Sequence, residues 1–283
     1  MKIDTVLENS YSIWHKCGKY GIKESIYGRN YIVAEEKNTE LYDMFDNPDN
    51  LVLDALNTAL IVLEGKSKKI VRDSIMKFTD KYGFLGLINV LPRTASFFEQ
   101  ENVYFPKNHF VKAECMKKEQ YLNIFFPFNK PKGDWLYGKG KPPMPDLGEM
   151  LYLLPGYAEP YDWVVQQFKD WAYMLIASND DRIADKRNRR KDMYLRRRTF
   201  RTFDVAMPSY IIEYNSRPEL IWNFTSLWQV IDLFIKSAIT DPVSTICICQ
   251  KCLKVIKTEL VNLYEFRDFC CKECMEMNIN ANI

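Results

Sequence analysis

Cysteines near the C-terminal end are the residues whose type and spacing could do chemistry. Five of the eight cysteines form two close groups, Cys249-Gln-Lys-Cys252 and, after seventeen intervening residues, Cys270-Cys-Lys-Glu-Cys274. Two close pairs of thiolates joined by a loop suit tetrahedral Zn²⁺, whose sulfur ligands lie about 2.3 Å from the ion. We predict that Cys249, Cys252, Cys270 and Cys274 bind the metal, with Cys271 as the alternative to Cys270. Four protein ligands leave no open coordination position, which indicates structural rather than catalytic zinc.

The segments around these cysteines must position them. Residues 254–264 alternate in polarity and are rich in β-branched residues, which predicts a short hairpin, and residues 270–277 are expected to form a short helix. A cysteine turn, a hairpin and a helix would make a treble-clef-like module over residues 241–283. So small a module depends on its metal, because it cannot bury a core of its own. Cys247 and the unused cysteine of the second group would be spare thiols. The alternative is a cluster without metal, although disulfides are disfavoured in a reducing compartment.

A large domain over residues 1–240 should precede this module, because 283 residues exceed the usual length of one domain. Apolar spacing predicts helices over residues 50–69, 70–82, 161–177 and 217–239, the first capped at residues 46–49 and ended by Gly65. Residues 97–160 are rich in aromatic residues, Pro and Gly, which predicts irregular structure with short strands. The expected fold class is α+β, with a mainly helical large domain.

The location of the protein can also be predicted from the sequence. The first ten residues lack the apolar stretch of a secretory signal, and no apolar run reaches the roughly 20 residues of a membrane span. We therefore expect a cytoplasmic protein with no membrane partner.

The tail resembles that of bacterial proteins of the CGNR zinc-finger type. In that family a Cys-x-x-Cys turn is followed by an aromatic-Cys-x-x-x-Cys pair, which Phe269-Cys270 and Cys274 match. The family often carries an N-terminal stress-regulator-like domain called ABATE with a Leu-Asp-x-x-Asn-Thr motif, and residues 53–58 match this motif. Met275-Glu-Met stands where the family has Gly-Asn-Arg. The resemblance implies a DNA-binding transcription regulator.

Positive charge is concentrated in residues 182–201. This segment holds ten basic and two acidic residues, a net charge of +8, so the rest of the chain carries −6 of the total of +2. Such density could neutralise several phosphates, with DNA favoured over RNA, and Tyr194 and Phe200 could stack on bases. The predicted contacts are Arg187, Arg189, Arg190, Lys191, Arg196, Arg197, Arg198 and Arg201. The alternatives are a solvated surface that pairs with the acidic remainder, or a protein partner.

Catalytic patterns are scarce. The only histidines are His15 and His109, and the sequence has no P-loop, no Gly-x-Gly-x-x-Gly and no Gly-x-Ser-x-Gly. A group of acids could hold Mg²⁺ for a nuclease, but acids beside a basic run are usually paired with it. These acids are Asp180, Asp181, Asp185 and Glu213. We assign no catalytic residue and favour a role without enzymatic activity.

The leading hypothesis is therefore a nucleic-acid-associated regulatory protein with structural zinc. The alternative is a protein-interaction module or a sensor that binds a small ligand in an aromatic core. A third hypothesis is a metal-dependent nuclease or toxin effector.

Overall fold

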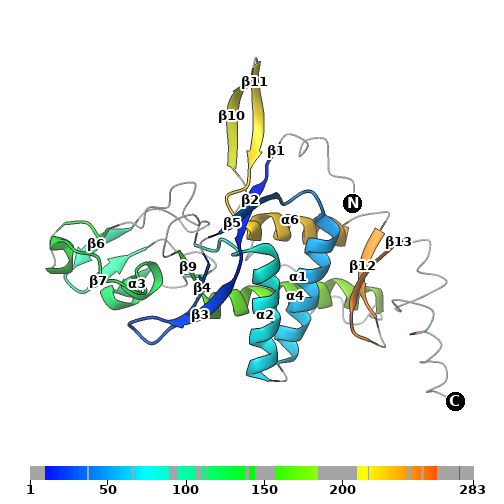
Figure 1. Cartoon of the computed structure of the whole chain (residues 1–283), viewed down its shortest axis with the longest axis horizontal. Coiled ribbons are helices and arrows are strands. Elements are labelled where there is room, and N and C mark those ends of the chain that lie inside the picture. Colours follow the sequence, from blue (N-terminus) through cyan, green and yellow to red (C-terminus); the bar gives the residue numbers. More distant parts are fainter. Residues whose placement is uncertain are drawn as a thin grey trace.

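The computed structural model describes residues 10–36, 38–65, 67–88, 95–105, 110–111, 114–137, 140–143, 157–183, 209–215, 217–240, 244–249, 252–259 and 274. Helices and several small β-sheets are mixed along this part of the chain, so the fold is α+β, as predicted (Figure 1). No helix of the described residues is long and apolar enough to cross a membrane.

The two helices predicted between residues 50 and 82 are both present, and capping residues mark where they begin and end. Helix α1 covers Pro48–Glu64, and the Asn47 side chain accepts a hydrogen bond from the Asn50 N–H at 3.3 Å. It ends at Gly65, which has a left-handed backbone with φ of 60°. Helix α2 covers Lys68–Tyr82, and Ser67 caps its first turn. These caps satisfy backbone groups that a helix end otherwise leaves unpaired.

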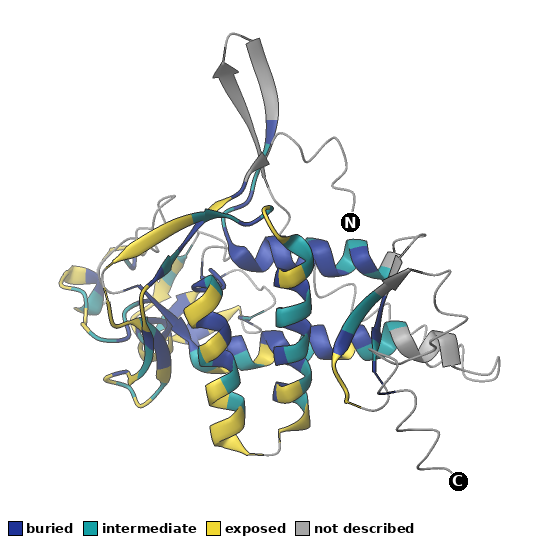
Figure 2. Cartoon of the chain, turned by 45° about the vertical axis from the view of Figure 1, so that its right-hand side comes forward, coloured by how far each residue is buried: buried dark blue, intermediate teal, exposed yellow. Residues whose placement is uncertain are grey.

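The apolar core lies among helices α1, α4 (Tyr161–Ile183) and α6 (Leu227–Thr240). Helix α1 packs against α2, α4 and α6, and α6 is buried along most of its length (Figure 2). Large rings fill the space between these helices, since Trp171, Phe168 and Phe234 are almost completely buried. The aromatic residues of the sequence therefore serve mainly to build this core.

The predicted helix over residues 217–239 is wrong in its first third. Residues Arg217–Asn223 form strand β11, which pairs antiparallel with β10 (Ser209–Asn215) along its whole length and parallel with the short β1 (Ser10–Tyr11). The β10–β11 hairpin projects away from the helices (Figure 1). Cross-strand pairing here overrides the helical spacing of the apolar residues, which single-sequence reasoning cannot detect.

The true start of α6, at Leu227, is capped by two side chains. The Ser226 hydroxyl accepts a hydrogen bond from the Gln229 N–H at 3.2 Å, and the Gln229 side chain accepts one from the Thr225 N–H at 2.9 Å. The sequence Ser226-Leu-Trp-Gln229 carries this signature, in which a capping Ser is followed three residues later by Gln. The predicted start at residue 217 instead placed Pro218 in the first turn of the helix, where proline is common.

Small sheets occupy the remaining described parts of the chain. Strands β2 and β5 form one sheet, β3, β4 and β9 a second, and β6, β7 and β8 a third that lies beside α3 (Figure 1). The expected short strands of residues 97–160 are thus present. The bounds are β2 Ile13–Cys17, β3 Tyr20–Glu24, β4 Asn30–Ala34, β5 Thr39–Asp43, β6 Ser96–Glu99, β7 Asn102–Tyr104, β8 Cys115–Lys117, α3 Lys118–Phe125, the 3₁₀ turn Asp134–Tyr137 and β9 Ala158–Pro160.

The hairpin near the C-terminal end joins the helices directly. Strand β12 (Ser244–Ile248) pairs antiparallel with β13 (Val255–Glu259), and this hairpin contacts α1, α4 and α6. Ile246 and Val255 are buried and belong to the same apolar cluster as the helices. The turn between the two strands holds the first cysteine pair.

Candidate metal centre

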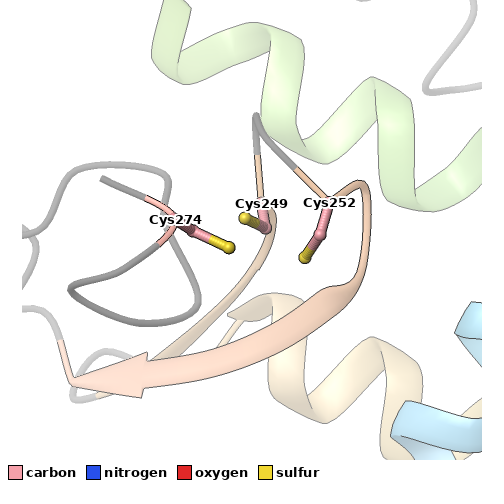
Figure 3. A group of neighbouring side chains, drawn as sticks. All are labelled: Cys249, Cys252 and Cys274. Atoms are coloured by element: carbon pink, nitrogen blue, oxygen red, sulfur yellow. The ribbon is translucent and has the colours of Figure 1, made fainter. Parts of the chain in front are cut away.

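Three of the four predicted metal ligands lie together. The sulfur atoms of Cys249, Cys252 and Cys274 are all within 4.8 Å of one another and point toward a common centre (Figure 3). Sulfurs bound to one tetrahedral zinc would be about 3.8 Å apart, so only a small approach is needed for all three to bind. A disulfide would join two of them and leave the third outside. The described thiols can therefore hold one metal ion.

The turn between β12 and β13 presents the first pair. The Cys249 N–H donates to the Lys254 carbonyl at 2.8 Å, and the Leu253 N–H donates back to the Cys249 carbonyl at 2.9 Å. Leu253 has φ of 58°, the only positive value among the described residues other than glycine. The left-handed backbone closes the turn tightly, so that Cys249 and Cys252 lie side by side.

The prediction of the hairpin needs correction in its pairing. We expected residues 254–264 to fold back on themselves, but β13 pairs with β12, which precedes the first cysteine pair. The β-branched strand is present, whereas its partner β12 was not predicted. The cysteine turn is consequently the turn of the hairpin itself.

The other three cysteines near the C-terminal end fall into two groups. Cys247 is buried in β12 opposite Ile256 and is not part of the described thiol cluster, which agrees with its interpretation as a spare thiol. Cys270 and Cys271 lie outside the described residues, as does the predicted helix around Cys274. The fourth ligand and the treble-clef arrangement therefore stay predictions.

Helix α1 holds the metal hairpin with two side chains. The Val255 N–H donates to Asn57 Oδ1 at 2.9 Å. The Lys257 ammonium donates to both carboxylate oxygens of Asp49, at 2.9 and 2.8 Å. Asn57 also donates through Nδ2 to the Leu53 carbonyl within α1, at 2.7 Å. No sequence pattern indicates these contacts, because their partners are about two hundred residues apart.

The predicted nucleic-acid contacts lie outside the described residues. This holds for Arg187, Arg189, Arg190, Lys191, Arg196, Arg197, Arg198 and Arg201. The basic segment begins at the last turn of α4, and α4 contacts β12. The end of α4 lies beside the metal hairpin (Figure 1).

The structure describes no catalytic site formed by the residues that the sequence suggested for catalysis. His15 is fully buried in β2 beside the Trp14 ring, whose centroid is 5.4 Å away, and is part of the core. His109 and Asp185 lie outside the described residues. Asp180 and Asp181 belong to the last turns of α4, and Glu213 belongs to β10.

A buried carboxyl group was missed by sequence reasoning. Glu159 in β9 is 1% exposed and accepts hydrogen bonds from the Leu85 and Leu87 N–H groups at 2.9 and 2.7 Å. The Tyr157 hydroxyl donates to the same carboxyl at 3.3 Å. Burial raises the pKa of Glu159 to about 7, against the opposing effect of the backbone N–H groups. This acid anchors the loop that follows α2.

Comparisons with known proteins give no relative. No family model, no curated protein and no solved structure matches the chain.

Proposed function

We propose that the protein is a nucleic-acid-associated regulatory protein built around a structural zinc ion. Cys249, Cys252 and Cys274 supply three thiolates, and Cys270 supplies the fourth, with Cys271 as the alternative. The observation that carries the proposal is the mutual approach of three sulfur atoms from two separate segments to within 4.8 Å.

Zinc is the metal that this donor set favours. A site made only of thiolates excludes the hard cations Mg²⁺ and Ca²⁺, which prefer oxygen, and tetrahedral sulfur sites hold Zn²⁺ or iron–sulfur clusters. Close pairs on a tight turn match the ligand spacing of structural zinc. With all four positions taken by protein, the ion would shape the chain and perform no chemistry on a substrate.

Contact with nucleic acid is assigned to residues 182–201. The segment carries +8 whereas the rest of the chain carries −6, so the attraction of phosphate would be local to it. It starts at the end of α4, which packs against β12 of the metal hairpin. In this proposal the zinc fixes the hairpin, the hairpin supports the end of α4, and α4 presents the basic segment.

Elemental analysis and cobalt substitution test the zinc. We expect one zinc per chain, and Co²⁺ should give the intense visible absorption of a tetrahedral thiolate site. Cys274→Ser should weaken metal binding strongly, whereas Cys115→Ser, which changes an exposed thiol in β8, should not. A protein that contains no metal and gives no cobalt spectrum would overturn the zinc proposal.

Salt-dependent binding tests the nucleic-acid partner. Charge reversal at Arg196, Arg197 and Arg198 to Glu should reduce affinity for duplex DNA and lower the slope of log K against log salt by about 3. A matched control reverses the exposed Lys68, Lys69 and Lys77 of α2, which changes net charge equally. Equal losses in both variants, or affinity that ignores salt, would contradict the assignment.

The other hypotheses stay predictions. The resemblance of the tail to CGNR-type zinc-finger proteins, the sensor or protein-interaction module and the nuclease each remain a separate expectation. Metal-dependent degradation of nucleic acid that is lost in Asp180→Asn would favour the nuclease.

A further inference from the structure

One peptide group connects the metal turn with helix α1. The carbonyl of Lys254 and the N–H of Val255 belong to the same planar unit. Its carbonyl accepts a hydrogen bond from the Cys249 N–H at 2.8 Å, and its N–H donates to Asn57 Oδ1 at 2.9 Å. The orientation of this peptide is therefore determined from both sides, by a metal ligand and by an α1 side chain.

Asn57 is itself held in place. Its Nδ2 donates to the Leu53 carbonyl one turn earlier in α1, at 2.7 Å, so its Oδ1 is directed at the hairpin. The side chain is half-buried, and Val255 is almost completely buried in the apolar cluster that includes α1. A hydrogen bond in such surroundings is stronger than one in water. The contact can thus fix the turn before any metal arrives.

A second contact holds the middle of β13. Lys257 lies two residues after Val255, and its ammonium reaches both oxygens of Asp49 at the start of α1. Lys257 is 20% exposed and Asp49 44%, so this ion pair lies at the rim of the contact. The strand is held along α1 at two points, which limits its rotation relative to the helix.

We propose that Asn57 is a positioning residue of the metal centre, which orients the Lys254–Val255 peptide and through it Cys249. The proposal rests on the proposed zinc site. A turn held in its binding geometry loses less conformational entropy when metal binds, so α1 raises metal affinity. By linkage, bound metal stabilises the packing of α1 by the same free energy.

Metal titration of two Asn57 variants tests the proposal. Asn57→Ala and Asn57→Asp both lose the bond to Leu53, but Asp retains an oxygen that accepts from the Val255 N–H. We expect Asn57→Ala to bind Co²⁺ and Zn²⁺ about 10-fold or more weakly, in the range measured for groups that orient ligands. Asn57→Asp should lose less affinity than Asn57→Ala, because its carboxylate still accepts from the Val255 N–H although it has no donor for the Leu53 carbonyl. Asn50→Ala, which changes an exposed asparagine of the same helix, is the control.

The outcomes separate this inference from the zinc proposal. If the wild type gives no tetrahedral thiolate cobalt spectrum, the zinc proposal fails. If the wild type binds normally and Asn57→Ala binds with the same affinity, the positioning role is overturned. Equal losses in Asn57→Ala and Asn57→Asp would also overturn it, since the acceptor would then be irrelevant.

If Asn57→Ala fails to fold, a variant of the contact between Lys257 and Asp49 tests the proposal instead. Lys257→Met retains the apolar stem of the lysine and removes only its ion pair with Asp49. We expect metal affinity to fall several-fold, with the cobalt spectrum unchanged in shape. Wild-type affinity in Lys257→Met would then overturn the coupling between α1 and the metal turn.

Discussion

Among single residues, Glu159 has a chemistry that depends strongly on its surroundings. Three backbone N–H groups and the Tyr157 hydroxyl favour its charged form, yet removal from water favours the neutral form more strongly, and its pKa rises to about 7. The sequence Ala-Glu-Pro gave no indication of this, because burial of an acid depends on loops and helices that meet only in the folded chain. The free energy of folding consequently depends on the protonation of this residue.

Stability should decrease as pH rises between about 4.5 and 7. In this window the folded state retains a proton on Glu159 that the unfolded state releases, so stability is full below about pH 4.5 and is lost as pH passes 7. The expected loss is on the order of 2–3 kcal/mol. Urea unfolding of the wild type and Glu159→Gln at pH 5 and pH 8, both with chelator, measures it. The variant should show a smaller pH dependence, and an equal dependence in both proteins would refute the role of Glu159.

Leu253 has a left-handed backbone, which suits glycine better than leucine. A left-handed backbone costs a non-glycine residue about 1–2 kcal/mol, and the Leu253 side chain is half exposed and contributes little packing. Leu253→Gly should therefore maintain metal binding and raise stability by up to about 1 kcal/mol. Lys254→Gly, at an exposed neighbouring position, should instead lower stability slightly. Denaturant unfolding of the three proteins distinguishes these effects, and a destabilised Leu253→Gly would contradict the account.

At the scale of elements, capping residues made part of the fold predictable. Asn47 and Gly65 bound α1 as the sequence predicts, and Ser67 caps the start of α2 in the same way. Pairing was harder to predict, because β11 has helical apolar spacing and β12 has no strong strand signal. Strand partners depend on contacts between distant segments, which residue spacing does not encode.

The loop after α2 is an element that tolerates little change. The Leu85 carbonyl accepts from the Trp228 N–H of α6 at 2.8 Å, and the Phe84 carbonyl accepts from the Trp14 indole at 3.0 Å. Gly86 has φ of 75°, and a Cβ there would lie 2.7 Å from Ser226 Cβ and 2.9 Å from the Trp14 ring. Only glycine fits between these neighbours.

Gly86→Ala should accordingly destabilise the protein by about 2–4 kcal/mol, from the backbone and from overpacking together. Gly140→Ala is the matched control, because Gly140 has φ of 79° but no atom within 4 Å of an added Cβ. The control should lose only about 1–2 kcal/mol. Thermal unfolding of both variants measures the difference, and equal losses would show that the close packing at Gly86 is unimportant.

For the whole molecule, the candidate metal ligands were easier to predict from the sequence than their surroundings. The spacing of Cys249 and Cys252 predicted their turn, and Cys274 lies where it can bind the same ion. The role of Asn57 could not be predicted, because its partner Val255 is 198 residues away. Spacing shows which thiols can share an ion but not which helix supports them.

Metal removal should affect unfolding of the whole molecule. With zinc at 1,000 times its dissociation constant, binding contributes about 4 kcal/mol, which corresponds to roughly 8–16 °C in Tm. We expect chelation to lower one transition, observed at the same temperature by circular dichroism and by tryptophan fluorescence. A separate early transition of the metal segment, with tryptophan fluorescence unchanged, would instead show that residues 241–283 unfold independently.

The distance along the chain between α1 and its hairpin has a consequence for synthesis. Asn57 leaves the ribosome 198 residues before Val255, an interval of about 10–40 s at the usual rates of translation. During that time the apolar side of α1 that β13 will cover has no partner from the hairpin. This surface of the nascent chain therefore stays uncovered until β12 and β13 have been synthesised. Chaperone binding during translation should be concentrated there.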